Sequence, residues 1–209
     1  MFKKLSLEQW IKFATGLYKC DIVAVSDNGI IGTVIVFGTD NGDEFKACHF
    51  LTYAGDGIGL IIESDGKNTC GKHLINDYMK KVMEGKVRLQ AFRAKGGVTQ
   101  EEIKRAETFW ELHKDGKYNW WANFWFGVWG IANKINRQFG SWLSSLKNPA
   151  YKDGSSTVCS QTTILQFKGG DNRLYDPIVA QCPIENLTPE ALHKILPVAF
   201  DMVMDTETI

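Results

Sequence analysis

Cys159 is the residue of this 209-residue chain best placed to act as a nucleophile. It stands in the segment STVCSQTTILQF, directly after a short polar stretch and directly before apolar residues at helical spacing. A thiol at the start of a helix lies near the positive end of the helix dipole, which favours the thiolate, the nucleophilic form. This position therefore indicates a reactive cysteine, whereas most free cysteines are small buried hydrophobes.

A histidine and a carboxylate are predicted to face each other on a hairpin earlier in the chain. The segment FKACHFLTYAGDGIGLIIES contains two strand-like runs around Gly55-Asp56-Gly57, which we interpret as a three-residue hairpin loop. That loop pairs Ala54 with Ile58. His49 then lies opposite Glu63, with Cβ atoms about 5 Å apart, and the carboxylate fixes the imidazole tautomer and favours its protonated form. Together with the cysteine, this pair has the parts of a cysteine hydrolase or acyltransferase.

The same two residues also fit a simpler arrangement. A histidine and a glutamate on facing strands are often an ordinary solvated polar pair with no catalytic role. The register matters as well, because a loop of two or four residues would move Glu63 to the other face of the sheet. The sequence also leaves open whether the fold brings His49 close to Cys159.

Neighbouring residues offer alternative members of this site. Asp65 follows Glu63 by two positions, so strand alternation places it on the same face, and it is the second choice as the orienting acid. His73 is expected to start a helix and could replace Glu63 as the third member. Cys48 precedes His49 and points to the opposite face, as expected for a core residue.

The remaining cysteines and histidines have no arrangement that indicates chemistry. Cys20, Cys70 and Cys182 have no histidine at a useful spacing, and we interpret them as structural or incidental. His113 and His193 fall in amphipathic helical segments and are expected to be solvated. The five cysteines form no CxxC pair, so free thiols are the simplest interpretation. Catalysis by a thiol, an imidazole and a carboxylate needs no metal or cofactor.

The order of the predicted elements indicates an α+β fold. Helices are expected at about 7–13, 72–84, 100–113 and 118–142, and strands at about 21–25, 33–38, 45–53, 58–64 and 86–92. These elements do not alternate as βαβ units would. We therefore expect an antiparallel sheet packed against helices in a single domain, residues 1–209, with an aromatic-rich helical insert at about 110–151.

Two further helices are predicted in the last quarter of the chain. The helix that contains Cys159 would be capped by Ser156 or Thr157 and would end at Gly169-Gly170. The last helix would open at Thr188-Pro189, with proline at its first position.

Composition and charge indicate neither nucleic-acid binding nor a membrane span. The chain has 24 basic and 24 acidic side chains, a formal net charge of zero and no long basic run. Its start, MFKKLSLEQW, lacks the apolar run of a signal peptide. The most apolar stretch, WWANFWFGVWGI, is shorter than the roughly 20 residues of a membrane span, although Trp120 to Trp129 could contact a lipid interface. A cytoplasmic or virion-associated protein is expected.

Four segments, in this order, resemble the circularly permuted papain-like hydrolases. They are CDIVAVSDNGIIGTVIVFGT, ACHFLTYAGDGIGLIIESDGK, STVCSQTTILQF and ENLTPEAL, and they extend over about residues 20–192. The group includes the NlpC/P60-type and YiiX-like proteins, and the lecithin–retinol acyltransferases are relatives. In that family a strand similar to GDIVLF comes first. It is followed by a strand with the catalytic histidine, a GDG turn and a strand with an acidic residue. The nucleophile comes late, in a CSE or CSQ element at the start of a helix, and a TP-x-x-L segment often follows it.

The resemblance implies a role for each matching residue. It assigns His49 as the catalytic histidine, Glu63 as the orienting acid and Cys159 as the nucleophile. Asp21 matches the aspartate of the first strand, which we interpret as structural, and Thr188-Pro189 match the late TP element. It also implies a cysteine hydrolase, of amidase or peptidase type, that cleaves an amide or ester through a thioester. The implied substrates are peptide-like, such as cell-wall peptides, or contain a lipid acyl group.

The chain departs from this family in two places, and two other functions stay open. Phe50-Leu51 follow the histidine, and Cys48 precedes it, where the family often has small residues, as in SHVG. The aromatic insert has no motif in common with the family. One alternative is a lipid acyltransferase of the same fold, with an apolar pocket formed by the insert. The other is a non-catalytic papain-like module that binds a partner through the insert.

Overall fold

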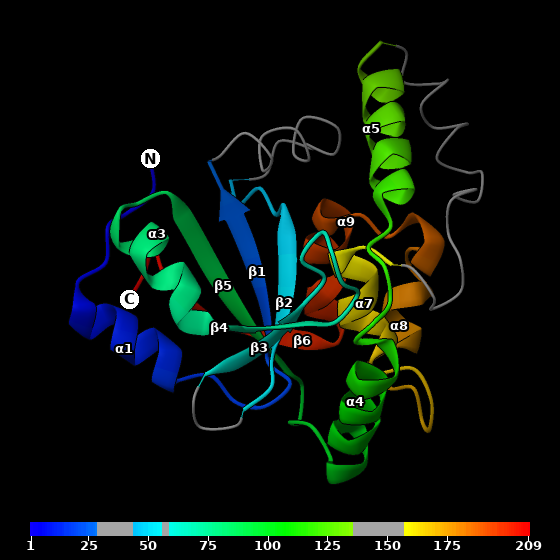
Figure 1. The fold of residues 1–209 in the computed structure, drawn as a ribbon, viewed down its shortest axis with the longest axis horizontal. Helices are drawn as coiled ribbons and strands as arrows, with labels where there is room; N and C mark the ends of the chain where they lie inside the picture. Colours follow the sequence, from blue (N-terminus) through cyan, green and yellow to red (C-terminus); the bar gives the residue numbers. More distant parts are fainter. Residues whose placement is uncertain (29–43, 56–58, 136–156) are drawn as a thin grey trace.

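The structure is a computed structural model that describes residues 1–28, 44–55, 59–135 and 157–209. Within these ranges the centre is a six-stranded antiparallel sheet with the strand order β4-β3-β2-β1-β5-β6 (Figure 1). The strands are β1 Ile22–Asp27, β2 His49–Tyr53, β3 Leu60–Glu63, β4 Gly71–Leu74, β5 Val87–Ala94 and β6 Phe200–Asp205. The predicted α+β class and the antiparallel sheet are confirmed.

Helices precede, interrupt and follow the strands, and several begin at the caps that the sequence indicates. Capping boxes at Ser6 and Thr99 open two of them, and the Thr188 side chain accepts a hydrogen bond from the Ala191 N–H at the start of another. The α-helices are α1 Leu7–Thr15, α3 Met79–Met83, α4 Gln100–His113, α5 Trp120–Ile135, α7 Cys159–Leu165, α8 Asp176–Val179 and α9 Pro189–Ile195. Short 3₁₀ turns are η1 Ile75–Tyr78, η2 Ile184–Asn186 and η3 Leu196–Val198.

Helices cover both faces of the sheet, as Figure 1 shows. Alternate residues along each strand point to opposite faces, so one core contains Val23 and Leu51 and the other contains Ala24 and Phe50. The first core is closed by α1 and α3. The second is closed by α7, α8 and α9, and it includes Cys159. The sheet therefore separates two apolar layers.

The hairpin between β2 and β3 differs in register from the prediction. Leu51 pairs with Glu63, and Ala54 N–H donates to the carbonyl of Leu60, so the loop covers residues 55–59, of which 56–58 lie outside the described ranges. The predicted three-residue loop, which put His49 directly opposite Glu63, is wrong. Because the slip is two residues, both side chains stay on the same face and become diagonal neighbours.

Several other elements also differ from the sequence-based expectation. Residues 71–74 form β4 and not the start of a helix, because His73 pairs with Ile61 of β3 and tertiary pairing overrides the local pattern. The last strand, β6, is absent from the prediction. Helix α7 is capped by Val158, which makes no side-chain cap hydrogen bond, and ends at Leu165, well before the predicted glycines. The predicted strand at 33–38 and the insert beyond residue 135 lie outside the described residues.

His113 and His193 are half-buried, so the prediction that both are solvated is wrong. The His113 ring stacks on Phe109 with a centroid distance of 4.2 Å. The His193 ring stacks on Phe45 at 4.7 Å, and its Nε2 makes a 2.7 Å hydrogen bond with Gln90 Oε1. His113 therefore packs on a ring of its own helix, whereas His193 packs α9 against Phe45.

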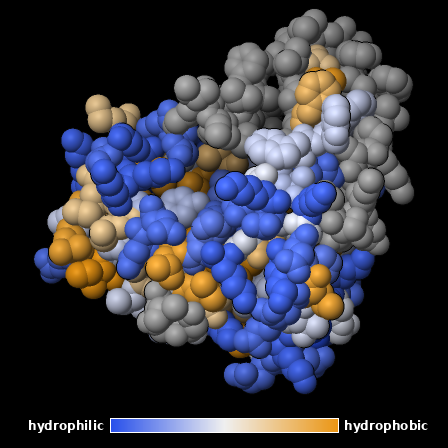
Figure 2. All heavy atoms as spheres, viewed as in Figure 1, coloured by the Kyte–Doolittle hydropathy of each residue, from blue (hydrophilic) through white to orange (hydrophobic). Residues whose placement is uncertain are grey.

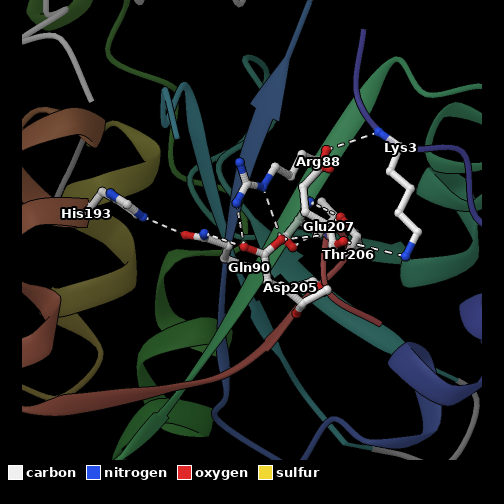
Figure 3. A network of polar contacts seen from close by, with 9 residues as sticks. Lys3, Arg88, Gln90, His193, Asp205, Thr206 and Glu207 are labelled. Carbon is white, nitrogen blue, oxygen red and sulfur yellow. Dashed lines mark hydrogen bonds and ion pairs between the residues drawn. The ribbon is translucent and has the colours of Figure 1, made fainter. Parts of the chain in front are cut away.

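Charged groups tie β5 to both of its neighbours in the sheet, β1 and β6. Asp21, just before β1, is almost fully buried and receives two hydrogen bonds from the Arg93 guanidinium of β5. Asp205 of β6 receives hydrogen bonds from both Arg88 and Gln90 of β5 (Figure 3). The structural role expected for Asp21 agrees with these contacts.

Helix α5 presents aromatic side chains to solvent and to the protein. Trp120, Trp121 and Phe124 are exposed, whereas Phe126 packs against Val158, the residue before α7. Leu7 and Ile11 of α1 are also exposed. Figure 2 shows hydrophobic atoms on the surface where α1 lies in Figure 1. In the part of the chain that is described, no helix combines the length and the apolar character needed to cross a bilayer.

Candidate active site

Cys159 is the first residue of α7 and is held there by its neighbours in the chain. Ser160 Oγ donates to the carbonyl of Leu187 at 2.5 Å. The Gln161 amide donates to the carbonyl of Ile184 and accepts from the N–H of Val158. These bonds connect the CSQ segment to residues 184–187, which precede α9, and to Val158. They therefore fix the start of α7. The Cys159 residue itself is only 3% exposed.

His49 and Glu63 lie at the same end of the sheet and contact each other. His49 is the first residue of β2 and Glu63 the last residue of the antiparallel neighbour β3. His49 Nε2 lies 2.5 Å from Glu63 Oε2. The histidine side chain is 22% exposed and that of the glutamate 9%, so solvent reaches this pair mainly from the histidine side.

His49 interacts with both Glu63 and Cys159. Burial by itself lowers the pKa of His49, but the charge of Cys159, a hydrogen bond with that side chain and the contact with Glu63 raise the pKa to about 10. Because Nε2 is occupied by Glu63, the other ring nitrogen, Nδ1, is the one available to Cys159. The imidazole therefore favours its cationic form in this position.

Glu63 has a second hydrogen-bond donor that the sequence did not indicate. The hydroxyl of Tyr78, at the end of η1, donates to Glu63 Oε2 at 2.8 Å. Burial raises the pKa of Glu63, but the bonds from His49 and then Tyr78 outweigh it and hold the pKa below its usual range. The carboxylate is thus ionised at neutral pH. Nothing in the local sequence pattern marks Tyr78, because its partner lies in another element.

The two alternative members of the site pair with each other. Asp65 Oδ2 lies 2.9 Å from His73 Nε2, and Asp65 also accepts N–H bonds from Lys67 and Asn68. Neither residue takes the place of Glu63 beside His49. The charge of His73 does contribute to the lowered pKa of Glu63.

The other four cysteines differ from Cys159 in their electrostatic surroundings. Burial raises the pKa of Cys20, Cys48 and Cys70 to about 12 and that of Cys182 to about 11. Cys48 is 3% exposed and its Sγ lies 3.3 Å from the carbonyl of Val25, as predicted for a core residue. Thiols with such pKa values are unreactive at neutral pH. Among the described residues, no group of three or more histidine, cysteine or acidic side chains is arranged to hold a metal ion.

Comparisons with known proteins find a distant structural neighbour of the chain. No protein-family model matches the chain, and no curated protein is a significant match. The chain is similar to the crystal structure of the metalloprotein YiiX from Escherichia coli O157:H7, DUF1105, with 11% sequence identity and a TM-score of 0.39. The match covers 58% of this chain and 67% of that one. A likeness this distant assigns neither a family nor an activity, so the function must be argued from the site.

Proposed function

We propose that the protein is a cysteine hydrolase of amides or esters, with Cys159 as nucleophile, His49 as proton carrier and Glu63 as orienting acid. The observation that carries the proposal is the position of His49, which contacts Glu63 through Nε2 and interacts with Cys159 at the same time. A thiol-based catalytic triad has the same arrangement. Its carboxylate orients the imidazole, and the imidazole exchanges a proton with the thiol.

The reaction follows from these positions. The Cys159 thiolate attacks the carbonyl carbon of the substrate and forms a tetrahedral oxyanion. His49, as imidazolium, gives its proton to the leaving amine or alcohol, and the carbon–nitrogen or carbon–oxygen bond breaks to leave a thioester on Cys159. Neutral His49 then takes a proton from water, the hydroxide attacks the thioester, and the carboxylic acid leaves with the thiolate regenerated. Glu63 holds the ring in one orientation and stabilises its cationic form throughout.

The proposal includes a circularly permuted papain-like fold in a single domain. Its support is the order of functional residues in the chain, with His49 on β2, Glu63 on β3 and Cys159 at the start of α7. That order matches the motifs of the permuted group, in which the histidine and the acid precede the nucleophile. The substrates implied by this resemblance are peptide-like.

A lipid acyltransferase is the second candidate, and one observation favours it. Helix α5 packs on Val158 next to the nucleophile and exposes Trp120, Trp121 and Phe124 on its outer side. An aromatic surface beside the site suits a substrate with an acyl chain. In this case the thioester would pass its acyl group to an acceptor other than water.

Alkylation of each cysteine, followed by mass spectrometry between pH 5 and 9, tests the proposal. We expect a small reagent such as iodoacetamide to modify Cys159 quickly at or below pH 7, and the other four cysteines slowly, because burial raises their pKa values. A panel of amides and esters, with and without an added acyl acceptor, then separates hydrolase from transferase, with Cys159→Ala as the inactive control. If Cys159 reacts like an ordinary thiol with a pKa of about 8.5, the proposal is wrong and a binding module becomes the better account.

A further inference from the structure

We propose that Tyr78 is a positioning residue of the site, which fixes the Glu63 carboxylate so that it can orient His49. This inference rests on the proposed function and extends it by a fourth residue. Two donors converge on one atom, because both the Tyr78 hydroxyl and His49 Nε2 lie within hydrogen-bond distance of Glu63 Oε2. With only the histidine as partner, the carboxylate could turn about its terminal bond and offer either oxygen. The tyrosine selects one of them.

The backbone around Tyr78 is fixed to the strand that carries Glu63. Turn η1 starts directly after β4, and β4 pairs with β3 so that Gly71 lies opposite Glu63. At the start of the turn, Ile75 N–H donates to the carbonyl of Gly59, the residue before β3. Hydrogen bonds of the β3–β4 pair and the η1 turn therefore fix the backbone of Tyr78 relative to that of Glu63.

The chemistry of the phenol agrees with a donor role. Burial, followed by the charge of Glu63, raises the pKa of Tyr78 well above its usual range, so the hydroxyl keeps its proton at neutral pH. A hydrogen bond to an ionised acceptor stabilises the charged form of that acceptor. Loss of the hydroxyl should therefore raise the pKa of Glu63.

The test compares Tyr78→Phe with wild type in the pH dependence of Cys159 alkylation. If Glu63 protonates at higher pH in the variant, it stops stabilising the His49 cation at a higher pH as the solution is acidified. The acid side of the rate profile then moves to higher pH. We expect alkylation about tenfold slower than wild type on that acid side, with a much smaller change above pH 7. Tyr18→Phe is the matched control, because its ring lies over Arg93 far from the site and is exposed, and it should leave the profile unchanged.

Two further variants separate positioning from simple destabilisation. In a Glu63→Gln background, Tyr78→Phe should produce no additional shift, because it acts through the carboxylate. Replacement of Tyr78 with 3,5-difluorotyrosine keeps the shape and makes the hydroxyl a stronger donor, so the acid side should move to lower pH. Unchanged profiles in both Tyr78 variants, with His49→Ala still abolishing fast alkylation, would overturn this inference and leave the proposed function standing. If His49→Ala has no effect either, both are wrong.

Discussion

Replacement of His49 with alanine should slow the alkylation of Cys159 at pH 7 by at least about tenfold. In the proposed site the imidazolium stabilises the thiolate, and Cys159 is the largest of the influences that raise the pKa of His49. Without the cation, a buried thiol has no partner to stabilise its charge, and only a few per cent of an ordinary thiol is ionised at this pH. The measurement is the rate of iodoacetamide modification at Cys159, read by mass spectrometry.

His113→Ala is the matched control for this experiment. His113 is also half-buried, but its ring stacks on Phe109 of α4 and its Nδ1 bonds with the carbonyl of the same residue, away from the site. Its replacement should leave the Cys159 rate within about a factor of two. Equal rates in wild type and His49→Ala, in proteins that unfold at similar temperatures, would show that the two residues are not coupled.

Asp205→Ala should lower the free energy of unfolding by about 3–5 kcal/mol. Asp205 accepts hydrogen bonds from Arg88 Nε and Nη2 at 3.0 and 2.6 Å and from Gln90 Nε2 at 2.7 Å, and Gln90 in turn bonds with His193 (Figure 3). The side chains of Arg88 and Asp205 are 11% and 5% exposed, so removal of the carboxylate leaves a buried cation without its counter-ion. Urea unfolding of the variant and wild type measures the difference.

The Asp205 effect should also depend on pH in a defined direction. Burial raises the pKa of Asp205, but the bonds from Arg88, the Glu207 N–H and Gln90 outweigh it and hold the pKa below its usual range. A depressed folded-state pKa contributes stability above the unfolded-state value of about 3.9, and that stability is lost as pH falls through the folded-state pKa. The difference in stability between wild type and variant should therefore stay nearly constant above about pH 4 and disappear as pH falls below the lowered pKa of Asp205.

A partly exposed neighbour provides the control for the Asp205 prediction. Glu207 accepts a hydrogen bond from the Lys3 N–H at the surface, so Glu207→Ala should cost less than about 1 kcal/mol. If the two replacements destabilise the protein equally, the Arg88–Asp205 network does not hold β6 to β5 in the way described.

Local signals in the sequence predicted three of the helix starts and the shared face of His49 and Glu63. The caps at Ser6, Thr99 and Thr188 form within about four residues of chain, so the residues that decide them are adjacent in sequence. The prediction that His49 and Glu63 share a face depended only on the period of two along a strand. It therefore survived an error of two residues in the register.

Features that depend on distant partners could not be predicted in the same way. Tyr78 reaches Glu63 because β4 pairs with β3, and the segment before it has the pattern of a helix. Strand β6 exists through its pairing with β5 and through Asp205, whose partners lie more than 100 residues earlier in the chain. Such contacts are set by tertiary packing, which leaves no short-range pattern in the sequence.

The most direct measurement of the central claim is an NMR titration of the His49 imidazole in wild type and in Cys159→Ala. Its signal, one of four histidines, is assigned by its absence from His49→Ala. We predict a pKa of about 10 in wild type and a clearly lower pKa in the variant, because the charge of Cys159 is the largest influence that raises it. A pKa near the ordinary value of 6.5 in both proteins would contradict the Cys159–His49–Glu63 site.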